Sequence, residues 1–313
     1  MGNGRSGAVR CGGGERGGRN WPAARWPRAQ VGQRGGSRRR LARELRRLRE
    51  AHRLKLAAAA KEPGVPLSTI SSIENATARR VRARDIDALA DLYRASEEER
   101  KALHGLTRES TESGWWSSYK DVFGGNALPD FEAEASLVRR FEGLTVPGLL
   151  QTPEYSTAVM RAGRVLGESA VERRVRARME RKNIFNRIKP PHTAAVIDEG
   201  ALRRVIGGPE VMREQLTYLK NMALRHHIGV QVLPYTAGAH LALAGPFTIL
   251  DFPNPRDPPI AYVETAVEGL HLDQPEEMER YTLAFGNVQS VAPSTPLSFQ
   301  LTDDVLRSPE DMA

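Results

Sequence analysis

Helix-breaking residues divide the stretch from Leu41 to Leu106 into short helical runs, and this division limits the fold more than any other feature of the chain. Leu41, Leu45 and Leu48 recur at helical spacing and form one apolar stripe. A second run ends at Pro63-Gly64, because proline cannot continue a helix and glycine tolerates a left-handed turn. We therefore expect an all-α bundle of five helices, over about 41–51, 55–61, 67–74, 84–93 and 97–106.

In the third of these runs, 67–74, apolar and hydroxyl side chains fall on different faces of the expected helix. Ile70 and Ile73 are spaced to face the core, whereas the intervening Ser and Thr residues are free to face outward. A small polar helix on a basic helical body is a common way for a protein to enter the major groove of DNA. The pattern therefore favours a DNA-binding module.

The net charge of +8 is distributed unevenly along the chain. Residues 1–110 hold 25 Lys or Arg and 12 Asp or Glu, a net charge of +13, whereas residues 111–313 hold 21 and 26, a net charge of −5. Genomic base composition can account for the preference for Arg over Lys, 39 to 7, but not for this split. The charge distribution indicates that a polyanion meets only the front of the molecule.

Length and composition favour two domains with tails at both ends. Residues 1–36 contain 11 glycines and no helical or strand period, so we expect them to be disordered, either as a basic arm or as a non-functional leader. The expected order is then a helical domain over 37–106, a linker over 107–113, a regulatory domain over 114–304 and a tail over 305–313. The single Cys11, with no apolar run of the ~18 residues that span a bilayer, predicts a cytoplasmic protein without a membrane partner.

The stretch 41–106 resembles the Xre-type helix-turn-helix of the lambda- and 434-repressor class. The best-matched pieces are LRRLREA, GV-x-x-STIS-x-IEN and DIDALADLY followed by SEEER. The resemblance implies that helix 67–74 is the recognition helix, that positions 67, 68 and 72 reach base edges, and that position 56 contacts the backbone or bases. Our own hypothesis is that base contacts come from Leu67, Ser68, Ser71 and Ser72, and phosphate contacts from Lys55, Arg79, Arg80 and Arg82. The whole set of expected DNA-binding residues is Lys55, Leu56, Leu67, Ser68, Thr69, Ser71, Ser72, Arg79, Arg80 and Arg82.

Several positions depart from this family. Lys55-Leu56 replaces the usual Thr-Gln, and Pro66 replaces the Ser that caps the recognition helix, a loss on the order of 1 kcal/mol. Leu67 and Ser72 stand where relatives often have Arg or Gln, side chains that discriminate bases by ~1–3 kcal/mol each. We expect weak or context-dependent sequence readout. A helical bundle that has lost DNA binding remains an alternative.

Behind the helical region, short strands alternate with helices. Strands are expected over 193–197, 229–233, 247–252 and 261–265, and helices over 131–141, 168–187, 199–205, 209–225 and 275–291. The strand–helix–strand order predicts that 193–197 and 229–233 form a parallel pair. The fold class is therefore α/β, or α+β.

The residues in this second region that could carry chemistry are few. Asp198-Glu199, Glu264, His226-His227, His240 and His271 match no acid–base or metal-ligand spacing, and no phosphate-binding loop motif occurs. We therefore expect no enzyme, no cofactor and no metal. A ligand pocket at the strand ends Asp198, Pro234 and Glu264, beside the loop 235–245, is one interpretation; an exposed VPGLLQ turn (146–151) that contacts a protein is another.

The segments GWW, VPGLLQTPEY, IDEGALRRVIGGPEVMREQLTYL, VQVLPYTAGAH, GPFTIL and YVE resemble the uncharacterised domain found behind an Xre-type helix-turn-helix in actinobacterial regulators, among them WhiJ-like developmental proteins. This resemblance implies a small partner protein encoded nearby. Our hypothesis from the sequence is a transcriptional regulator that binds double-stranded DNA as a homodimer under control of the C-terminal domain. The alternative is an antitoxin-like protein-interaction module with weakened DNA binding.

Overall fold

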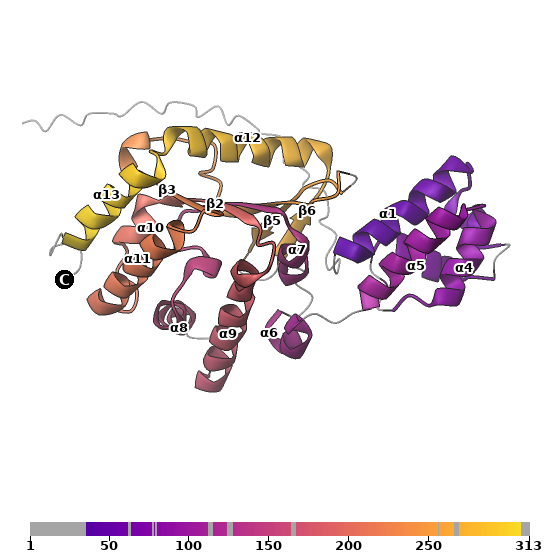
Figure 1. Ribbon diagram of the computed structural model, residues 1–313, viewed down its shortest axis with the longest axis horizontal. Coiled ribbons are helices and arrows are strands. Elements are labelled where there is room, and N and C mark those ends of the chain that lie inside the picture. The colour runs from indigo at the N-terminus through magenta and orange to yellow at the C-terminus, as the bar shows by residue number, and fades with distance from the viewer. Residues whose placement is uncertain are drawn as a thin grey trace, which may run out of the picture.

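The computed structural model describes residues 36–61, 64–76, 78, 80–111, 115–123, 128–163, 167–255, 257–265 and 269–307. An N-terminal helical domain is followed by a C-terminal domain built on one sheet (Figure 1). None of the helices within these ranges is long and apolar enough to cross a membrane. The expected tail 1–36 lies outside the described residues except for Gly36.

Among its described residues the helical domain has five helices, as predicted: α1 (Gly36–Ala51), α2 (Leu56–Ala59), α3 (Leu67–Glu74), α4 (Ala83–Leu92) and α5 (Glu97–Thr111). Its core combines the apolar stripes of these helices, with Leu45, Ile70, Ile86 and Leu103 all buried. Helix α5 continues into the expected linker 107–113, because Thr107 and Ser110 are buried against the bundle. Burial across this boundary keeps the helix intact.

The C-terminal domain contains a mixed six-stranded sheet in the order β3-β2-β1-β4-β5-β6. Its strands are β1 (Leu137–Glu142), β2 (His192–Asp198), β3 (Ile228–Leu233), β4 (Phe247–Asp251), β5 (Ile260–Glu264) and β6 (Gly269–Leu272). Strand β2 pairs in parallel with both β1 and β3, which confirms the predicted parallel pair. The pairs β1–β4, β4–β5 and β5–β6 are antiparallel.

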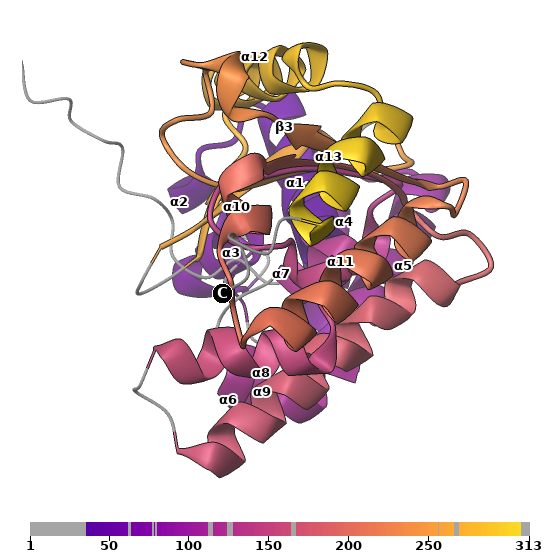
Figure 2. The same cartoon turned by 90° about the vertical axis from the view of Figure 1, so that its left-hand side faces the viewer.

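Helices cover both faces of this sheet, so the domain has three layers (Figures 1 and 2). Helix α12 (Pro275–Val291) crosses one face and packs on β1, β3, β4 and β5. The other elements are η1 (Trp115–Tyr119), α6 (Lys120–Phe123), α7 (Leu128–Glu134), η2 (Gly148–Leu150), α8 (Pro153–Ala162), α9 (Glu168–Arg181), η3 (Lys182–Asn186), α10 (Glu199–Arg203), α11 (Pro209–Ala223), η4 (Tyr235–Ala237) and α13 (Thr295–Arg307). Along β2, Ala195 and Ile197 pack under α8 and α11, whereas Val196 packs under α12. This alternation is what a strand buried on both faces requires.

Three expectations for this domain are wrong. The single helix over 131–141 is instead α7 followed by β1, because the segment supplies a central strand of the sheet. The expected tail begins inside α13, whose Val305 is buried against the sheet core. The VPGLLQ turn is also buried rather than exposed, since Val146, Leu149 and Leu150 belong to the largest apolar cluster.

Helix α1 joins the two domains through its first two turns. Arg40 pairs with Asp257 at 2.7 Å, Arg43 pairs with the same carboxylate at 2.9 Å, and Arg39 pairs with Asp273 at 2.9 Å. The Arg39 guanidinium also lies over the Phe131 ring, 5.3 Å from its centroid. A basic helix end therefore sits in an acidic notch of the C-terminal domain.

Candidate nucleic-acid interface

Helix α3 is amphipathic in the way its sequence predicts. Ile70 and Ile73 are buried in the bundle, while Leu67 is 46% exposed and Ser68 is exposed beside it. Thr69, Ser71 and Ser72 are half-buried. The N-terminal end of the helix is thus its accessible end, which is also the end that recognition helices place against base edges.

Two of the expected base-reading hydroxyls already take part in hydrogen bonds within α3. The Ser72 hydroxyl donates to the Thr69 carbonyl at 2.8 Å, and the Ser71 hydroxyl accepts from the Asn75 side-chain amide at 3.3 Å. Both hydroxyls would have to rotate or share these bonds to contact a base. Leu67 and Ser68 are consequently the best-placed residues for direct readout.

A buried ion pair fixes the orientation of α3, and sequence reasoning missed it. The Arg49 guanidinium donates to both carboxylate oxygens of Glu74, with Nε–Oε1 and Nη2–Oε2 distances of 2.8 Å each. Arg49 also donates to the Leu54 carbonyl, just before α2, at 2.8 Å, and Arg46 donates to the Glu74 carbonyl at 3.1 Å. The pair therefore links α1, α3 and the start of α2. A Glu at a core-facing position of a short helix was the signal available in the sequence.

Exposed cations precede and follow this helix in the chain. Lys55, Arg80 and Arg82 are exposed, as phosphate-contacting side chains must be. Arg79 lies outside the described residues. Leu56 is half-buried and packs against the bundle core, so its position favours a packing role over a base contact.

The first turns of α3 and α4 add a second attraction for phosphate. Pro66 and Arg82 precede these helices, and neither N-terminus receives a side-chain cap. Amide groups at an uncapped helix N-terminus carry partial positive charge and remain able to donate to an anion. The loss of the expected Ser cap is therefore compatible with DNA contact, although it lowers helix stability.

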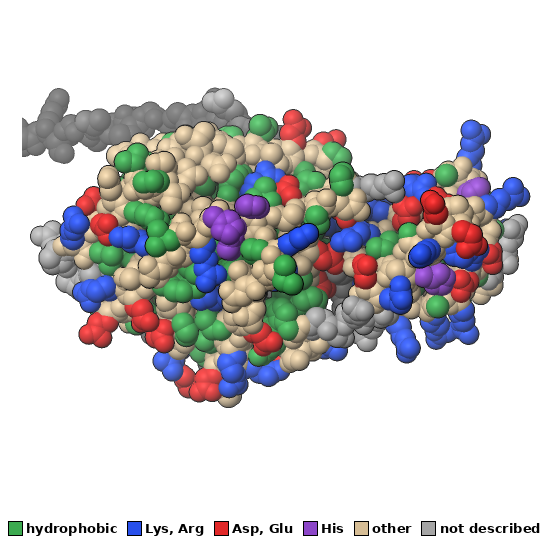
Figure 3. All heavy atoms as spheres, viewed as in Figure 1, with side chains coloured by type: hydrophobic (Ala, Val, Ile, Leu, Met, Phe, Trp, Pro, Cys, Tyr) green, Lys and Arg blue, Asp and Glu red, His purple; other side chains and the backbone are tan. Residues whose placement is uncertain are grey.

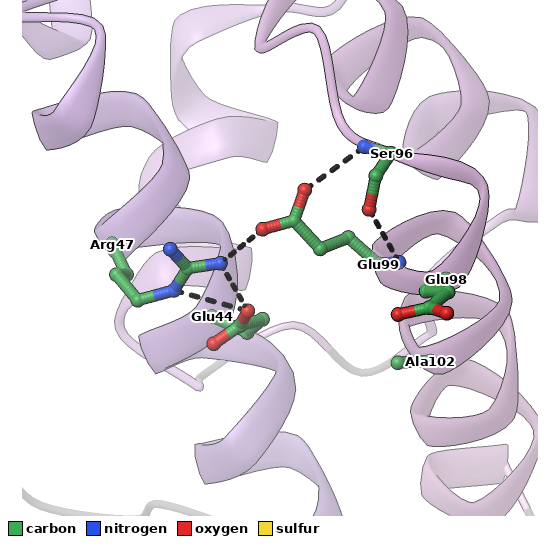
Figure 4. A pocket seen from close by; sticks show the side chains of 6 residues that line it. All are labelled: Glu44, Arg47, Ser96, Glu98, Glu99 and Ala102. Atoms are coloured by element: carbon green, nitrogen blue, oxygen red, sulfur yellow. Dashed lines mark hydrogen bonds and ion pairs between the residues drawn. The ribbon is translucent and has the colours of Figure 1, made fainter.

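The side of the domain formed by α1 and α5 has the opposite character. In Figure 2, α2 and α3 lie to one side and α5 to the other. A shallow pocket there is lined by Glu44, Arg47, Ser96, Glu98, Glu99 and Ala102 (Figure 4). Arg47 is shared between Glu44 and Glu99, both at 2.6 Å, which leaves an acidic surplus that repels phosphate. The charge distribution thus favours the α3 side over this one for contact with a polyanion.

In the C-terminal domain, the strand ends that were expected to form a pocket share one edge of the sheet. Strands β2, β3 and β5 all run in the same direction as β1, so Asp198, Pro234 and Glu264 lie at their carboxyl ends. Asp198 accepts from the Gly200 amide at 2.8 Å and caps α10. Glu199 accepts from the Tyr235 amide at 2.8 Å, so both acids have structural partners.

A buried charged cluster at this same edge was not predicted. Glu142 ends β1 and lies 3.8 Å from Arg140, and burial raises its pKa. Arg178 of α9 donates to the Gln151 side chain at 2.6 Å, and burial lowers its pKa to about 10. Partly desolvated charges of both signs at the carboxyl edge of a sheet are a common setting for a polar ligand.

The candidate histidines are scattered. His240 stacks near Phe141 (5.4 Å between ring centroids), and His271 packs between Phe131 and Tyr262 (5.0 and 5.3 Å). His226 is exposed and His227 is buried beside it, with burial lowering the pKa of His227. Within the described ranges, no three His, Cys, Asp or Glu side chains converge as a metal site would require.

Comparison with known protein families matches both parts of the chain. Residues 40–103 match the model of a helix-turn-helix domain, and residues 126–301 match that of a domain of unknown function, DUF5753. The two matches coincide with the bundle and with the sheet domain. No curated protein matches the chain.

Proposed function

The chain belongs to the family of the domain of unknown function DUF5753, here preceded by a helix-turn-helix domain, and on this premise we propose that it is a sequence-specific DNA-binding transcriptional regulator. Helix α3 reads the major groove, and Lys55, Arg80 and Arg82 contact phosphates on either side. The regulator acts in the cytoplasm as a homodimer, because one such helix reads only a few base pairs. By resemblance we further assign it to the actinobacterial, WhiJ-like Xre-type regulators.

The observation that carries this proposal is the arrangement around α3. The helix presents Leu67 and Ser68 outward, the buried Arg49–Glu74 pair holds it against α1, and the segments before and after it carry the exposed cations Lys55, Arg80 and Arg82. Leu67 can contact a thymine methyl group, and Ser68 can donate to or accept from a base edge. This chemistry supports modest discrimination between sequences on top of a strong phosphate contribution.

For the C-terminal domain we propose control of output through a small ligand or a small partner protein, without catalysis. The converging strand ends and the Glu142–Arg140–Arg178 cluster support a binding role at the carboxyl edge of the sheet. Asp198 and Glu199 are occupied in capping and turn contacts, which favours structural roles for both.

An antitoxin-like protein-interaction module is the second candidate. The internal hydrogen bonds of Ser71 and Ser72, with Leu67 where an Arg or Gln would read a base, favour weakened DNA binding. Under this alternative the helical domain serves mainly as a scaffold, and the adjacent gene product is its partner.

An electrophoretic mobility shift with DNA from the protein's own promoter region separates the two candidates. We expect the full-length protein to shift this DNA in preference to a scrambled fragment. Affinity should fall steeply with salt, and Arg80→Ala/Arg82→Ala should lower it and reduce the salt slope by about 2. Binding no stronger than to scrambled DNA, with or without the adjacent gene product, would sink the regulator and favour the interaction module.

A further inference from the structure

Two stretches of the C-terminal domain contain no Lys, Arg, Asp or Glu. They are residues 226–250 and 281–302, in a chain of which 27% is charged. The first includes the loop between β3 and β4, and the second includes most of α12 and the start of α13. Strand β3 and the core side of α12 are buried, which accounts for part of this composition, but the loop and the outer side of α12 are not.

The two stretches meet on the outer surface of α12. The Leu241 amide donates to the Asn287 side chain at 3.0 Å, which ties the loop to the helix. Leu283 on α12 is 59% exposed, and Leu241 and Leu243 on the loop are 63% and 67% exposed. Val291 extends the same exposed apolar surface at the end of the helix. We call Leu241, Leu243, Leu283, Gly286 and Val291 the α12 face. In Figure 3, uncharged side chains and backbone cover the C-terminal part of α12 on the side in view, and charges reappear toward its N-terminal end.

Gly286 leaves room for another helix to approach this face closely. It lies on the exposed side of α12, where glycine is the poorest residue after proline for helix stability. A Cβ built at this position meets nothing within 4 Å, so packing within the chain does not require glycine there. A close neighbour outside the chain would require it.

We propose that the α12 face is the surface through which two copies of this chain pair, with α12 lying against α12 of the second copy around a two-fold axis. This inference rests on the homodimer of the proposed function and assigns its interface. The occupant follows from charge: residues 226–250 and 281–302 contain no Lys, Arg, Asp or Glu, so the face of a second copy covers this one without burying a charge in either. An apolar, neutral surface is complementary to itself, as a two-fold contact requires.

The geometry is compatible with DNA binding. The α12 face lies on the sheet domain, and neither α3 nor the exposed cations Lys55, Arg80 and Arg82 belong to it. Pairing through α12 therefore leaves both recognition helices of the dimer uncovered by this contact. Because the face is independent of DNA, its occupancy can be measured without DNA.

Sedimentation equilibrium of the full-length protein without DNA tests the proposal. We expect a dimer whose dissociation constant rises about 100-fold in Leu283→Glu, since each copy would bury an unpaired carboxylate. Gly286→Leu should weaken the dimer by at least 10-fold, because its side chain fills the space left for the second helix. Ile188→Glu is the matched control, since Ile188 is fully exposed outside the face, and it should leave the dimer intact.

Circular dichroism checks that each variant remains folded. We expect both to fold, because Leu283 is exposed and a Cβ at position 286 meets nothing within 4 Å. A monomeric wild type at high protein concentration would overturn the proposal, and so would a dimer retained in either Leu283→Glu or Gly286→Leu. A dimer that shifts no promoter DNA would refute the regulator instead, so failure of the interface and failure of the function give different results.

Discussion

At the scale of single residues, Glu74 is the side chain on which the reading helix depends most. Its carboxylate is only 2% exposed and both oxygens accept from Arg49, itself mostly buried. A buried ion pair adds little net stability, yet removal of one partner leaves an uncompensated charge in the interior. The same pair determines how α3 is presented, so stability and the proposed DNA recognition are coupled here.

We expect Glu74→Gln to lower the free energy of unfolding of the helical domain by about 3 kcal/mol, because it leaves the Arg49 guanidinium buried without a counter-charge. Denaturant unfolding followed by circular dichroism measures this change. Glu44→Gln is the control: its partner Arg47 is half exposed, so the loss should stay below about 1 kcal/mol. Equal losses in the two variants would contradict the role given to the pair.

His271 makes stability depend on pH. Burial, aided by the nearby Arg39, lowers its pKa from 6.5 to about 4. Between these values the unfolded chain binds a proton that the folded chain does not, so stability is complete above pH 6.5 and falls as the pH approaches 4. Below pH 4 the free energy of unfolding is lower by about 3 kcal/mol in total.

Thermal unfolding at a series of pH values measures this contribution. In His271→Phe the unfolding temperature should decline less between pH 6.5 and 4 than in the wild type. In His52→Gln, a substitution at an exposed histidine, it should decline as in the wild type. A decline of unchanged steepness in His271→Phe would show that other groups cause it.

At the scale of elements, helix starts and ends were largely predictable because their signals are local. The Ser96 capping box is an example: the Glu99 amide donates to the Ser96 hydroxyl at 3.2 Å, and the Ser96 amide donates back to the Glu99 carboxylate at 2.9 Å (Figure 4). The strands over 193–197 and 229–233 were predictable for the same reason, since buried β-branched runs are bounded by turns.

Ser96→Ala should destabilise the helical domain by on the order of 1 kcal/mol, because the α5 N-terminus loses the acceptor that caps it. Hydrogen exchange of the first α5 amides provides a local readout. Thr217→Ala is the control. It removes an exposed hydroxyl that donates to the Arg213 carbonyl within α11, at 2.8 Å, and should change the free energy of unfolding by no more than about 0.5 kcal/mol. Protection of the α5 amides unchanged by Ser96→Ala would contradict this assignment.

The elements that sequence reasoning missed depend on contacts far along the chain. Strand β1 reads as part of a helix. It becomes a strand because β2 and β4 pair with it from 55 to 115 residues away, as Phe141 opposite Val196 and Ser136 bonded to Asp251 illustrate. The VPGLLQ turn looks exposed from its Pro and Gly, yet helices α8 and α11 cover it. The Arg49–Glu74 pair is likewise formed by residues on two different helices. Patterns within a window of residues contain little of this information.

At the scale of the whole molecule, the acidic notch around Asp257 determines how the two domains are held. The Asp257 carboxylate is buried between Arg40 and Arg43, and the Ser37 amide donates to Glu134 at 3.1 Å beside it. These contacts fix the start of α1 relative to the sheet domain. The orientation of the bundle relative to the sheet therefore depends on residues of the C-terminal domain.

Asp257→Lys should separate the domains, because two arginines would then face a buried cation, and the radius of gyration from small-angle X-ray scattering should increase. Adding Arg40→Glu and Arg43→Glu should restore much of the compact form. Asp303→Lys is the control. It replaces an ion pair with Lys220 inside the C-terminal domain by two lysines and should leave the radius of gyration unchanged. An unchanged radius in Asp257→Lys would show that the ion pairs do not hold the junction.

The central claim, that α3 reads DNA sequence, is tested most directly by selection of bound fragments from a random DNA pool, followed by sequencing. For the wild type we expect an enriched site with two related halves whose centres lie about 10 base pairs, or a multiple, apart. Leu67→Ala/Ser68→Ala should lose this enrichment while still binding DNA in a salt-dependent manner. A wild-type pool without any enriched site, or the same site enriched by the double variant, would contradict the claim.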